Sequence, residues 1–181
     1  MTCCGTRLRS GDLVFVSPRN ANAITAVTQG AAQRPIDHVA IFDGRIFIEA
    51  VPARGVCVTS ADSFYAAHRN DMLCIGRPSR RADLRQSLDN ARRYLGLPYD
   101  SLYSDTDSAI YCSELVQKSY VGRDGRQLFP TIPMEFRDST GQIPAYFIEF
   151  YHSRGMDVPE GRPGSNPGQL SRHPAIKMKD R

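Results

Sequence analysis

Two apolar runs on either side of an Asp-Gly pair constrain the fold of this chain more than any other feature. The first run is His38-Val39-Ala40-Ile41-Phe42, and the second is Ile46-Phe47-Ile48-Glu49-Ala50-Val51. Asp43-Gly44 stands between them, and an Asp-Gly pair flanked by apolar residues is the strongest short-range signal of a β-hairpin. The sequence therefore predicts two antiparallel strands joined by a tight turn.

The predicted register brings the one histidine of the first strand beside the one acid of the second. We take Asp43-Gly44 as a two-residue loop, which pairs Phe42 with Arg45. The same register places His38 opposite Glu49, and opposite residues project from the same face of a sheet. A carboxylate beside an imidazole fixes its tautomer and stabilises the imidazolium, as the third member of a catalytic triad does.

A cysteine at an expected helix start supplies a candidate nucleophile. Cys112 follows a loop rich in Asp, Ser and Tyr, and Leu115, Val116 and Tyr120 recur after it at helical spacing. Free backbone N–H groups and the positive end of the helix dipole favour thiolate over thiol at such a position. Cys112 therefore needs only a base within reach, and His38 is the candidate.

Each of these three residues also has a structural explanation. A lone cysteine is more often a small buried apolar residue, a lone histidine on a strand is often a satisfied core or edge residue, and Glu49 would be unremarkable at a strand end near solvent. The structural explanations weaken together, because a buried Glu or His needs a polar partner and each supplies the other. From the residues alone, we favour a Cys-His-Glu hydrolase acting on an amide, ester or thioester.

The rest of the chain alternates strand-like and helix-like segments, which predicts an α+β fold with an antiparallel sheet and helices packed around it. Residues 81–95 form the clearest helix, because apolar residues recur on one face and Gly96 ends it. Further strands are expected at 11–17, 56–59 and 72–77, and further helices at 20–29 with Asn20 as cap, from Ser60 onward, and from Pro144 onward.

Five short motifs occur in a defined order. They are Gly11-Asp12-Leu13-Val14-Phe15, His38-Val39-Ala40, Ile48-Glu49-Ala50, Tyr94-Leu95-Gly96-Leu97-Pro98-Tyr99-Asp100 and Tyr111-Cys112-Ser113-Glu114-Leu115. In this set and order the chain resembles the NlpC-type papain-like cysteine peptidases, and more closely their circularly permuted YiiX-like branch, from about Ser10 to Pro174. Each motif is weak alone, but five in order are fairly specific.

The resemblance implies a papain-like (permuted NlpC-type) fold, with an antiparallel sheet or small barrel and helices packed around it. It implies Cys112 as nucleophile, His38 as base and Glu49 as the orienting acid, the same three residues that the hairpin and helix patterns indicate. As substrate it implies a peptidoglycan stem peptide or a related cell-wall amide. The Pro/Gly-rich segment at about 156–181 also resembles the tail of some bacterial members, where it packs over the domain, whereas composition alone also allows a linker.

Three residues near the expected nucleophile are candidates for substrate binding. Tyr99 and Asp100 lie in the segment leading to Cys112, although ordinary loop chemistry explains them equally well. Tyr111 is placed to offer its hydroxyl or backbone near an oxyanion, or simply to pack. The backbone N–H of Cys112 or of a neighbour is the better oxyanion donor.

Length and charge narrow the class of protein further. The 181 residues suit a single domain, 1–181, with an N-terminal tail at 1–9. The net charge of +4 is spread without a run of like charges, and no nucleic-acid-binding motif occurs, so we expect no nucleic-acid partner. We expect a peptide or cell-wall fragment as partner, and the oligomeric state is left open.

Cysteine and histidine spacing predicts no metal and no cofactor. The five cysteines, an odd number, stand at positions 3, 4, 57, 74 and 112 without CxxC spacing, and His68, His152 and His173 are scattered. No transmembrane segment or complete secretory signal occurs. We therefore leave the location open between the cytoplasm and, if a leader has been removed, the cell envelope or periplasm, where Cys3 or Cys4 would be a candidate for lipid attachment.

Two other functions compete with the amidase. Permuted papain-like folds also include lipid-directed acyltransferases and thioesterases of the lecithin:retinol acyltransferase-like type, which usually carry an Asn-Cys-Glu-His-Phe box and a hydrophobic tail. This chain has Tyr111-Cys112-Ser113-Glu114-Leu115 and no such tail, which favours the amidase. The other alternative is a catalytically silent binding domain in which Cys112 is structural.

Overall fold

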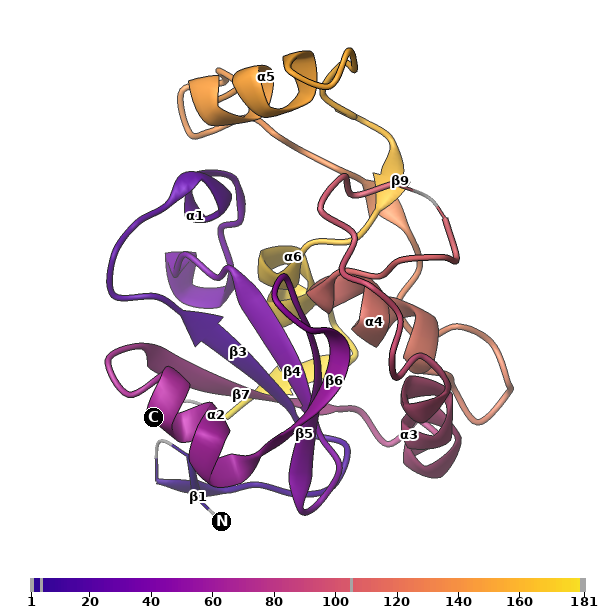
Figure 1. The fold of residues 1–181 in the computed structure, drawn as a ribbon. Helices are drawn as coiled ribbons and strands as arrows, with labels where there is room; N and C mark the ends of the chain where they lie inside the picture. Colours follow the sequence, from indigo (N-terminus) through magenta and orange to yellow (C-terminus); the bar gives the residue numbers. More distant parts are fainter. Residues whose placement is uncertain (1, 4, 105, 180–181) are drawn as a thin grey trace.

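A six-stranded antiparallel sheet forms the centre of the protein (Figure 1). The computed structural model describes residues 2–3, 5–104 and 106–179. The strand order is β10-β7-β3-β4-β5-β6, so the sheet is open rather than closed into a barrel within the described ranges. Its strands are β3 (Leu13–Ser17), β4 (His38–Phe42), β5 (Ile46–Val51), β6 (Gly55–Ser60), β7 (Met72–Pro78) and β10 (Ile176–Met178).

Both faces of this sheet are buried, which explains the nearly continuous apolar runs of its strands. On one face, alternate residues such as Val39 and Ile41 pack against α3 (Leu84–Arg93), α4 (Cys112–Ser119) and α6 (Pro167–Arg172). On the other face, Ala40 and Phe42 pack with α2 (Ala61–Ala67). Figure 1 shows α2 on one side of the sheet and the larger helical group on the other, which confirms the predicted α+β class.

A third apolar cluster lies beyond the sheet and covers the start of α4. It joins α5 (Ala145–His152) to α1 (Ala23–Val27) and to the loop that precedes α4. Figure 1 shows α5 above α1, away from the sheet. The buried members of the cluster are Met134, Phe136, Phe147 and Tyr151.

The turn of the predicted hairpin exists, but its register differs from the prediction by two positions. Phe42 pairs with Phe47 and not with Arg45. The Asp43 side chain accepts hydrogen bonds from the N–H groups of Arg45 and Ile46, so Asp43 closes the strand. Gly44, with a φ of +110°, takes the first position of the loop. A shift of two positions keeps every side chain on its predicted face.

The C-terminal segment is part of the fold, so the linker alternative is wrong. It contributes β9 (Pro163–Gly164), which pairs with β8 (Ile132–Pro133), and then α6 and the edge strand β10. At the other end, β1 (Thr2–Cys3) pairs with β2 (Thr6–Arg7). Met1, Cys4, Asp105 and 180–181 lie outside the described residues, and Cys4 was one of the two cysteines considered for lipid attachment.

Helix starts differ from the predicted ones where a closer cap is available. Asn22, not Asn20, caps α1, because its side chain accepts a hydrogen bond from the Thr25 N–H. The predicted helix 81–95 is shorter and begins after Asp83, whose carboxylate accepts from the Gln86 N–H. Within the described part of the chain, no helix is both long and apolar enough to cross a bilayer.

We predict that Gly55→Ala destabilises the protein by about 2–4 kcal/mol. Gly55 begins β6 with a φ of +65°, and a Cβ there would lie 2.1 Å from the Leu97 carbonyl oxygen. Gly125→Ala is the matched control, because Gly125 also has a positive φ, +75°, but open space around it. Denaturant unfolding measures both variants. Equal losses would show that the close approach to Leu97 does not constrain the fold.

Candidate active site

Cys112 is the first residue of α4, as the pattern after it predicts. Leu115 and Val116 on the same helix are fully buried against the sheet, and this packing fixes the position of the helix start. The Cys112 side chain is buried, and its Sγ lies 4.0 Å from the carbonyl oxygen of Asp37, the residue before β4. The thiol therefore lies at the end of β4 that carries His38.

The His38 imidazole bridges the thiol and the carboxylate. Its Nε2 lies 2.8 Å from Glu49 Oε2, and Cys112 is close enough to act on the pKa of the ring through hydrogen bonding and charge. Burial lowers the pKa of His38, but the hydrogen bonds and charges of Cys112 and Glu49 outweigh it and raise the pKa to about 10. At neutral pH this raised pKa favours the imidazolium form of the ring, which donates to Glu49 Oε2.

Glu49 is held by residues from the neighbouring strand and turn. Its Oε1 accepts a hydrogen bond of 2.5 Å from the Thr59 hydroxyl and lies 3.4 Å from a guanidinium nitrogen of Arg54. Burial raises the pKa of Glu49, but the hydrogen bond and charge of His38, with the Thr59 hydroxyl, lower it overall. Oε2 is therefore a fixed, ionised acceptor directed at the imidazole.

The thiol and the carboxylate approach the imidazole from opposite faces of the sheet. Strand alternation places His38 and Glu49 on the α2 face, whereas Cys112 starts α4 on the other face. His38 is the first residue of β4, so its ring lies at the end of the strand, where Cys112 can reach it. The observed register makes His38 and Glu49 diagonal neighbours instead of the predicted opposite pair.

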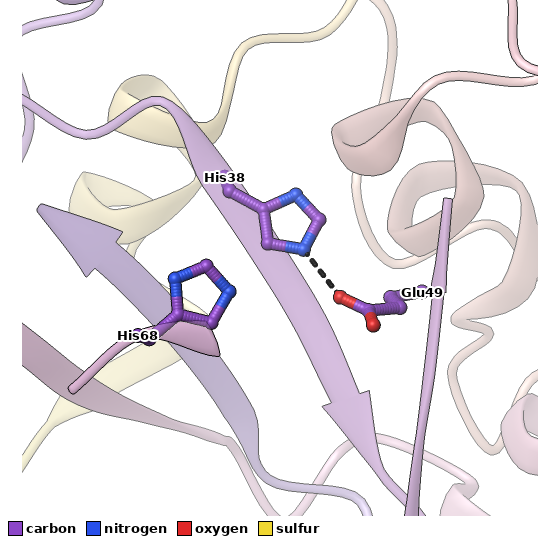
Figure 2. Close-up of side chains that lie close together, drawn as sticks. All are labelled: His38, Glu49 and His68. Carbon is purple, nitrogen blue, oxygen red and sulfur yellow. Dashed lines mark hydrogen bonds and ion pairs between the residues drawn. The ribbon is translucent and has the colours of Figure 1, made fainter. Parts of the chain in front are cut away.

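His68 joins the pair, and the sequence did not indicate it. His68 caps the C-terminal end of α2, and its ring stacks on that of His38 with centroids 6.0 Å apart (Figure 2). His38, Glu49 and His68 each offer one possible ligand atom, and these three atoms lie within 4.8 Å of one another. Together they form a set of donors that could hold a metal ion. A signal existed in the His-x-x-Asp spacing of His68 and Asp71, whose Nδ1 and Oδ2 atoms lie 2.9 Å apart.

Two of the three predicted substrate-binding residues line a pocket at the thiol. Tyr99 and Tyr111 share this pocket with Cys112. The Tyr111 hydroxyl accepts a hydrogen bond from the Ser165 N–H, so it also holds the C-terminal segment in place. Burial raises the pKa of Tyr111 to about 12, and it raises the pKa of Tyr99 further, so both hydroxyls stay protonated.

Asp100 lies elsewhere, within the loop that follows it. Its buried carboxylate accepts hydrogen bonds from the backbone N–H of Leu102, at 2.9 Å, and of Ser104, at 2.6 Å. These contacts are those of a residue that shapes the loop leading to the nucleophile. The structure does not bring Asp100 into the pocket with Tyr99 and Tyr111.

The fold and this site define the class of papain-like cysteine hydrolases, in which a helix start carries the thiol and a sheet carries the imidazole. The chain belongs to one family of that class, the permuted papain-like amidase enzymes (YaeF/YiiX, C92 family), whose family model matches residues 7–178. It is thus a member of an enzyme family of cysteine peptidases and amidases, as the sequence predicts.

A solved structure has the same fold. The metalloprotein yiiX from Escherichia coli O157:H7 superposes with a TM-score of 0.73 at 20% sequence identity, over 96% of this chain and 97% of that one. At this identity the likeness concerns the fold alone. A comparison with curated protein sequences finds no significant match.

We predict that Glu49→Gln lowers the pKa of His38 from about 10, because it removes a charge and an ionised acceptor that stabilise the imidazolium. Below pH 10 the wild-type ring is then mostly protonated, and the ring of the variant is protonated to a smaller extent. NMR titration of labelled histidine in metal-free buffer measures this. Glu149→Gln, at an exposed acid of α5, is the control for the same change in charge. An unchanged His38 titration in Glu49→Gln would contradict the assigned contact.

Proposed function

We propose that the protein hydrolyses an amide bond through Cys112, His38 and Glu49 by way of an acyl-enzyme. The observation that carries this proposal is that one imidazole forms a hydrogen bond with a buried carboxylate, and that a thiol at a helix start lies near enough to raise the pKa of that imidazole. A nucleophile, a base and an orienting acid in this order are the parts that nucleophilic acyl transfer requires. Membership of an amidase family supports the same reaction.

The proposed reaction has two halves. The Cys112 thiolate attacks the carbonyl carbon, and the N–H groups at the start of α4 stabilise the oxyanion. The His38 imidazolium donates its proton to the leaving amine as the C–N bond breaks, which leaves a thioester on Cys112. The neutral imidazole then takes a proton from water, the hydroxide adds to the thioester, and the released thiolate restores the starting ion pair. Glu49 keeps the ring oriented in both halves.

For the substrate, we propose a peptidoglycan stem peptide or a related cell-wall amide, with Tyr99 and Tyr111 along its binding pocket. The Tyr hydroxyls stay protonated at all physiological pH values and are therefore donors as well as acceptors. Tyr103 packs edge-on against Tyr111 and narrows the pocket on the same side.

The lining of this pocket also favours a second candidate, the lipid-directed acyl hydrolase or transferase. Beside Cys112 the walls are largely aliphatic and aromatic, and α1 and α5 both contribute to them. An acyl chain would gain about 0.8 kcal/mol for each methylene buried there. The apolar lining residues are Ile24, Val27, Met134, Phe136 and Phe147.

We expect Cys112→Ala to lower amide hydrolysis by roughly 10³-fold or more while the fold stays intact, because the nucleophile is removed. Glu49→Gln should lose roughly 10²- to 10⁴-fold, since the ring loses its orienting acid. Cys57→Ala is the matched control, at another free cysteine. Turnover of muropeptides followed by mass spectrometry is the assay, with unfolding curves for each variant. Full turnover by Cys112→Ala would remove the proposal.

Substitution in the apolar wall separates the two substrate classes. If an acyl chain occupies the pocket, Val27→Asn should raise the KM for a long-chain acyl amide or phospholipid about tenfold, and it should raise the KM for muropeptides much less. Ile148→Asn on α5 is the control, because Ile148 is 51% exposed and does not line the pocket. Cleavage of lipid with intact muropeptides would favour the second candidate over the cell-wall amide.

A further inference from the structure

Atoms that could bind a metal ion gather around His38 Nε2, the ring nitrogen that faces Glu49. His68 Nδ1 lies 2.9 Å from Asp71 Oδ2, and Figure 2 shows its ring beside the His38–Glu49 pair. Its other nitrogen, Nε2, has no hydrogen-bond partner among the described residues. Asp71 therefore orients the His68 ring, and His68 Nε2 is left free to bind an ion together with ligand atoms of His38 and Glu49.

We propose that His38, Glu49 and His68 form a binding site for a divalent transition-metal ion of the Zn²⁺ class. The donors would be His38 Nε2, Glu49 Oε2 and His68 Nε2. Two imidazoles and one carboxylate form a donor set that Zn²⁺ accepts, with a fourth position left for water. Mg²⁺ and Ca²⁺ prefer sets made of oxygen atoms alone, so this set selects against them.

The spacing of the donors suits such an ion. His38 Nε2 and Glu49 Oε2 are 2.8 Å apart, and all three ligand atoms lie within 4.8 Å of one another. Three ligands in a tetrahedral arrangement at about 2.1 Å from Zn²⁺ lie roughly 3.4 Å apart. That distance falls between the observed limits, so small rotations of the side chains would close the site.

Neighbouring side chains orient His68 and Glu49 through hydrogen bonds, as is usual for metal ligands. Asp71 binds the far nitrogen of His68, and an imidazole whose other nitrogen is bound to a carboxylate is a common metal ligand. Thr59 and Arg54 bind the other oxygen of Glu49, Oε1, and leave Oε2 for the ion. The half-exposed Arg54 opposes the cation, and the carboxylates of Glu49 and Asp71 offset it.

Two of the three ligands are accessible from a hollow other than the substrate pocket. Glu49 and His68 line a hollow on the α2 side, together with Arg54, Thr59 and Phe64. Cys112 and the tyrosines of the substrate pocket do not line this hollow. An ion can therefore reach Glu49 and His68 from the α2 side, whereas His38 lines a neighbouring hollow that it shares with His68, Tyr99 and Tyr103.

Binding of the ion would exchange a proton for a metal. His38 Nε2 releases its proton to solvent, the Nε2···Oε2 hydrogen bond is replaced by two metal–ligand bonds, and His68 Nε2 supplies a lone pair. The metal-bound ring can no longer become an imidazolium through this nitrogen and is drawn toward the ion. We therefore infer that the metal inhibits hydrolysis, a consequence that rests on the proposed function, whereas the binding itself does not.

The test of binding uses the full chain with Cys112→Ala, so that no thiolate at the site can contribute. Titration of Zn²⁺ by calorimetry should give one ion per chain, and Co²⁺ should give a visible spectrum of a four-coordinate site. His68→Ala in the same background should weaken binding at least tenfold, and Asp71→Asn by roughly 10- to 100-fold. His152→Ala, at an exposed histidine of α5, is the matched control and should bind as tightly as its parent.

Other outcomes would overturn the site. Loss of binding in Cys112→Ala, with a thiolate-to-cobalt charge-transfer band in the wild type, would assign the ion to the Cys112–His38 pair. Undiminished binding in both His68→Ala and Asp71→Asn would exclude His68 as a ligand. If His68→Ala unfolds, Asp71→Asn and the histidine NMR shifts of the metal-loaded parent decide, because only the proposed site perturbs His38 and His68 together.

Inhibition is measured in the wild-type protein, each variant being compared with its own metal-free activity. Zn²⁺ should inhibit wild type and His152→Ala alike, with recovery on adding EDTA, and the inhibitory concentration should rise at least tenfold in His68→Ala. Inhibition that is equal in His68→Ala would overturn the regulatory consequence. Absence of any hydrolytic activity would remove the proposed function, and the calorimetric result would stand unaffected.

Discussion

The site depends on the hydrogen bond between His38 Nε2 and Glu49 Oε2, at 2.8 Å. Neither group is tolerable alone in a largely buried position, because an isolated charge there costs several kcal/mol. Together they form an ion pair, and Thr59 and Arg54 also bind the other oxygen of the carboxylate. The pair therefore fixes where the ring can lie, and with it the place where the thiol must arrive.

The sheet brings together the groups that this pair requires. The ring and the acid come from adjacent strands of one hairpin, and Thr59 comes from the next strand, so a single antiparallel meander sets both the His38–Glu49 and the Glu49–Thr59 contact. The thiol comes from a helix more than sixty residues later in the chain and from the other face of the sheet. Packing of α4 on β4 and β5 makes this long-range contact reproducible, because it buries Leu115 and Val116 completely.

Much of this arrangement follows from local patterns in the sequence. The alternation along the two strands gave the correct shared face for His38 and Glu49 even though the register was off by two, because the side-chain period of a strand is two. The exact pairing depends on whether Asp43 enters the loop or closes the strand, and its side-chain bonds to the turn decide this. His68 and Asp100 show the limit of such patterns. Their partners are set by how α2 docks and how one loop folds, which periodicity does not encode.

The position of His68 gives the His38 ring two competing uses. Nδ1 serves the thiol, and Nε2 is the atom through which Glu49 orients the ring, so a metal at Nε2 acts on catalysis without touching Cys112. In the mechanism that we propose, an ion bound there leaves the Cys112 nucleophile chemically intact and removes only its base, His38. Such inhibition is reversible, because after the metal leaves, Nε2 takes up a proton from solvent and the hydrogen bond to Glu49 Oε2 forms again. The buried carboxylate of Glu49, which makes His38 a strong base, thus also makes His38 part of the proposed metal site. Whether His38 Nε2 binds a proton or a metal ion depends on whether an ion is bound at the α2 face.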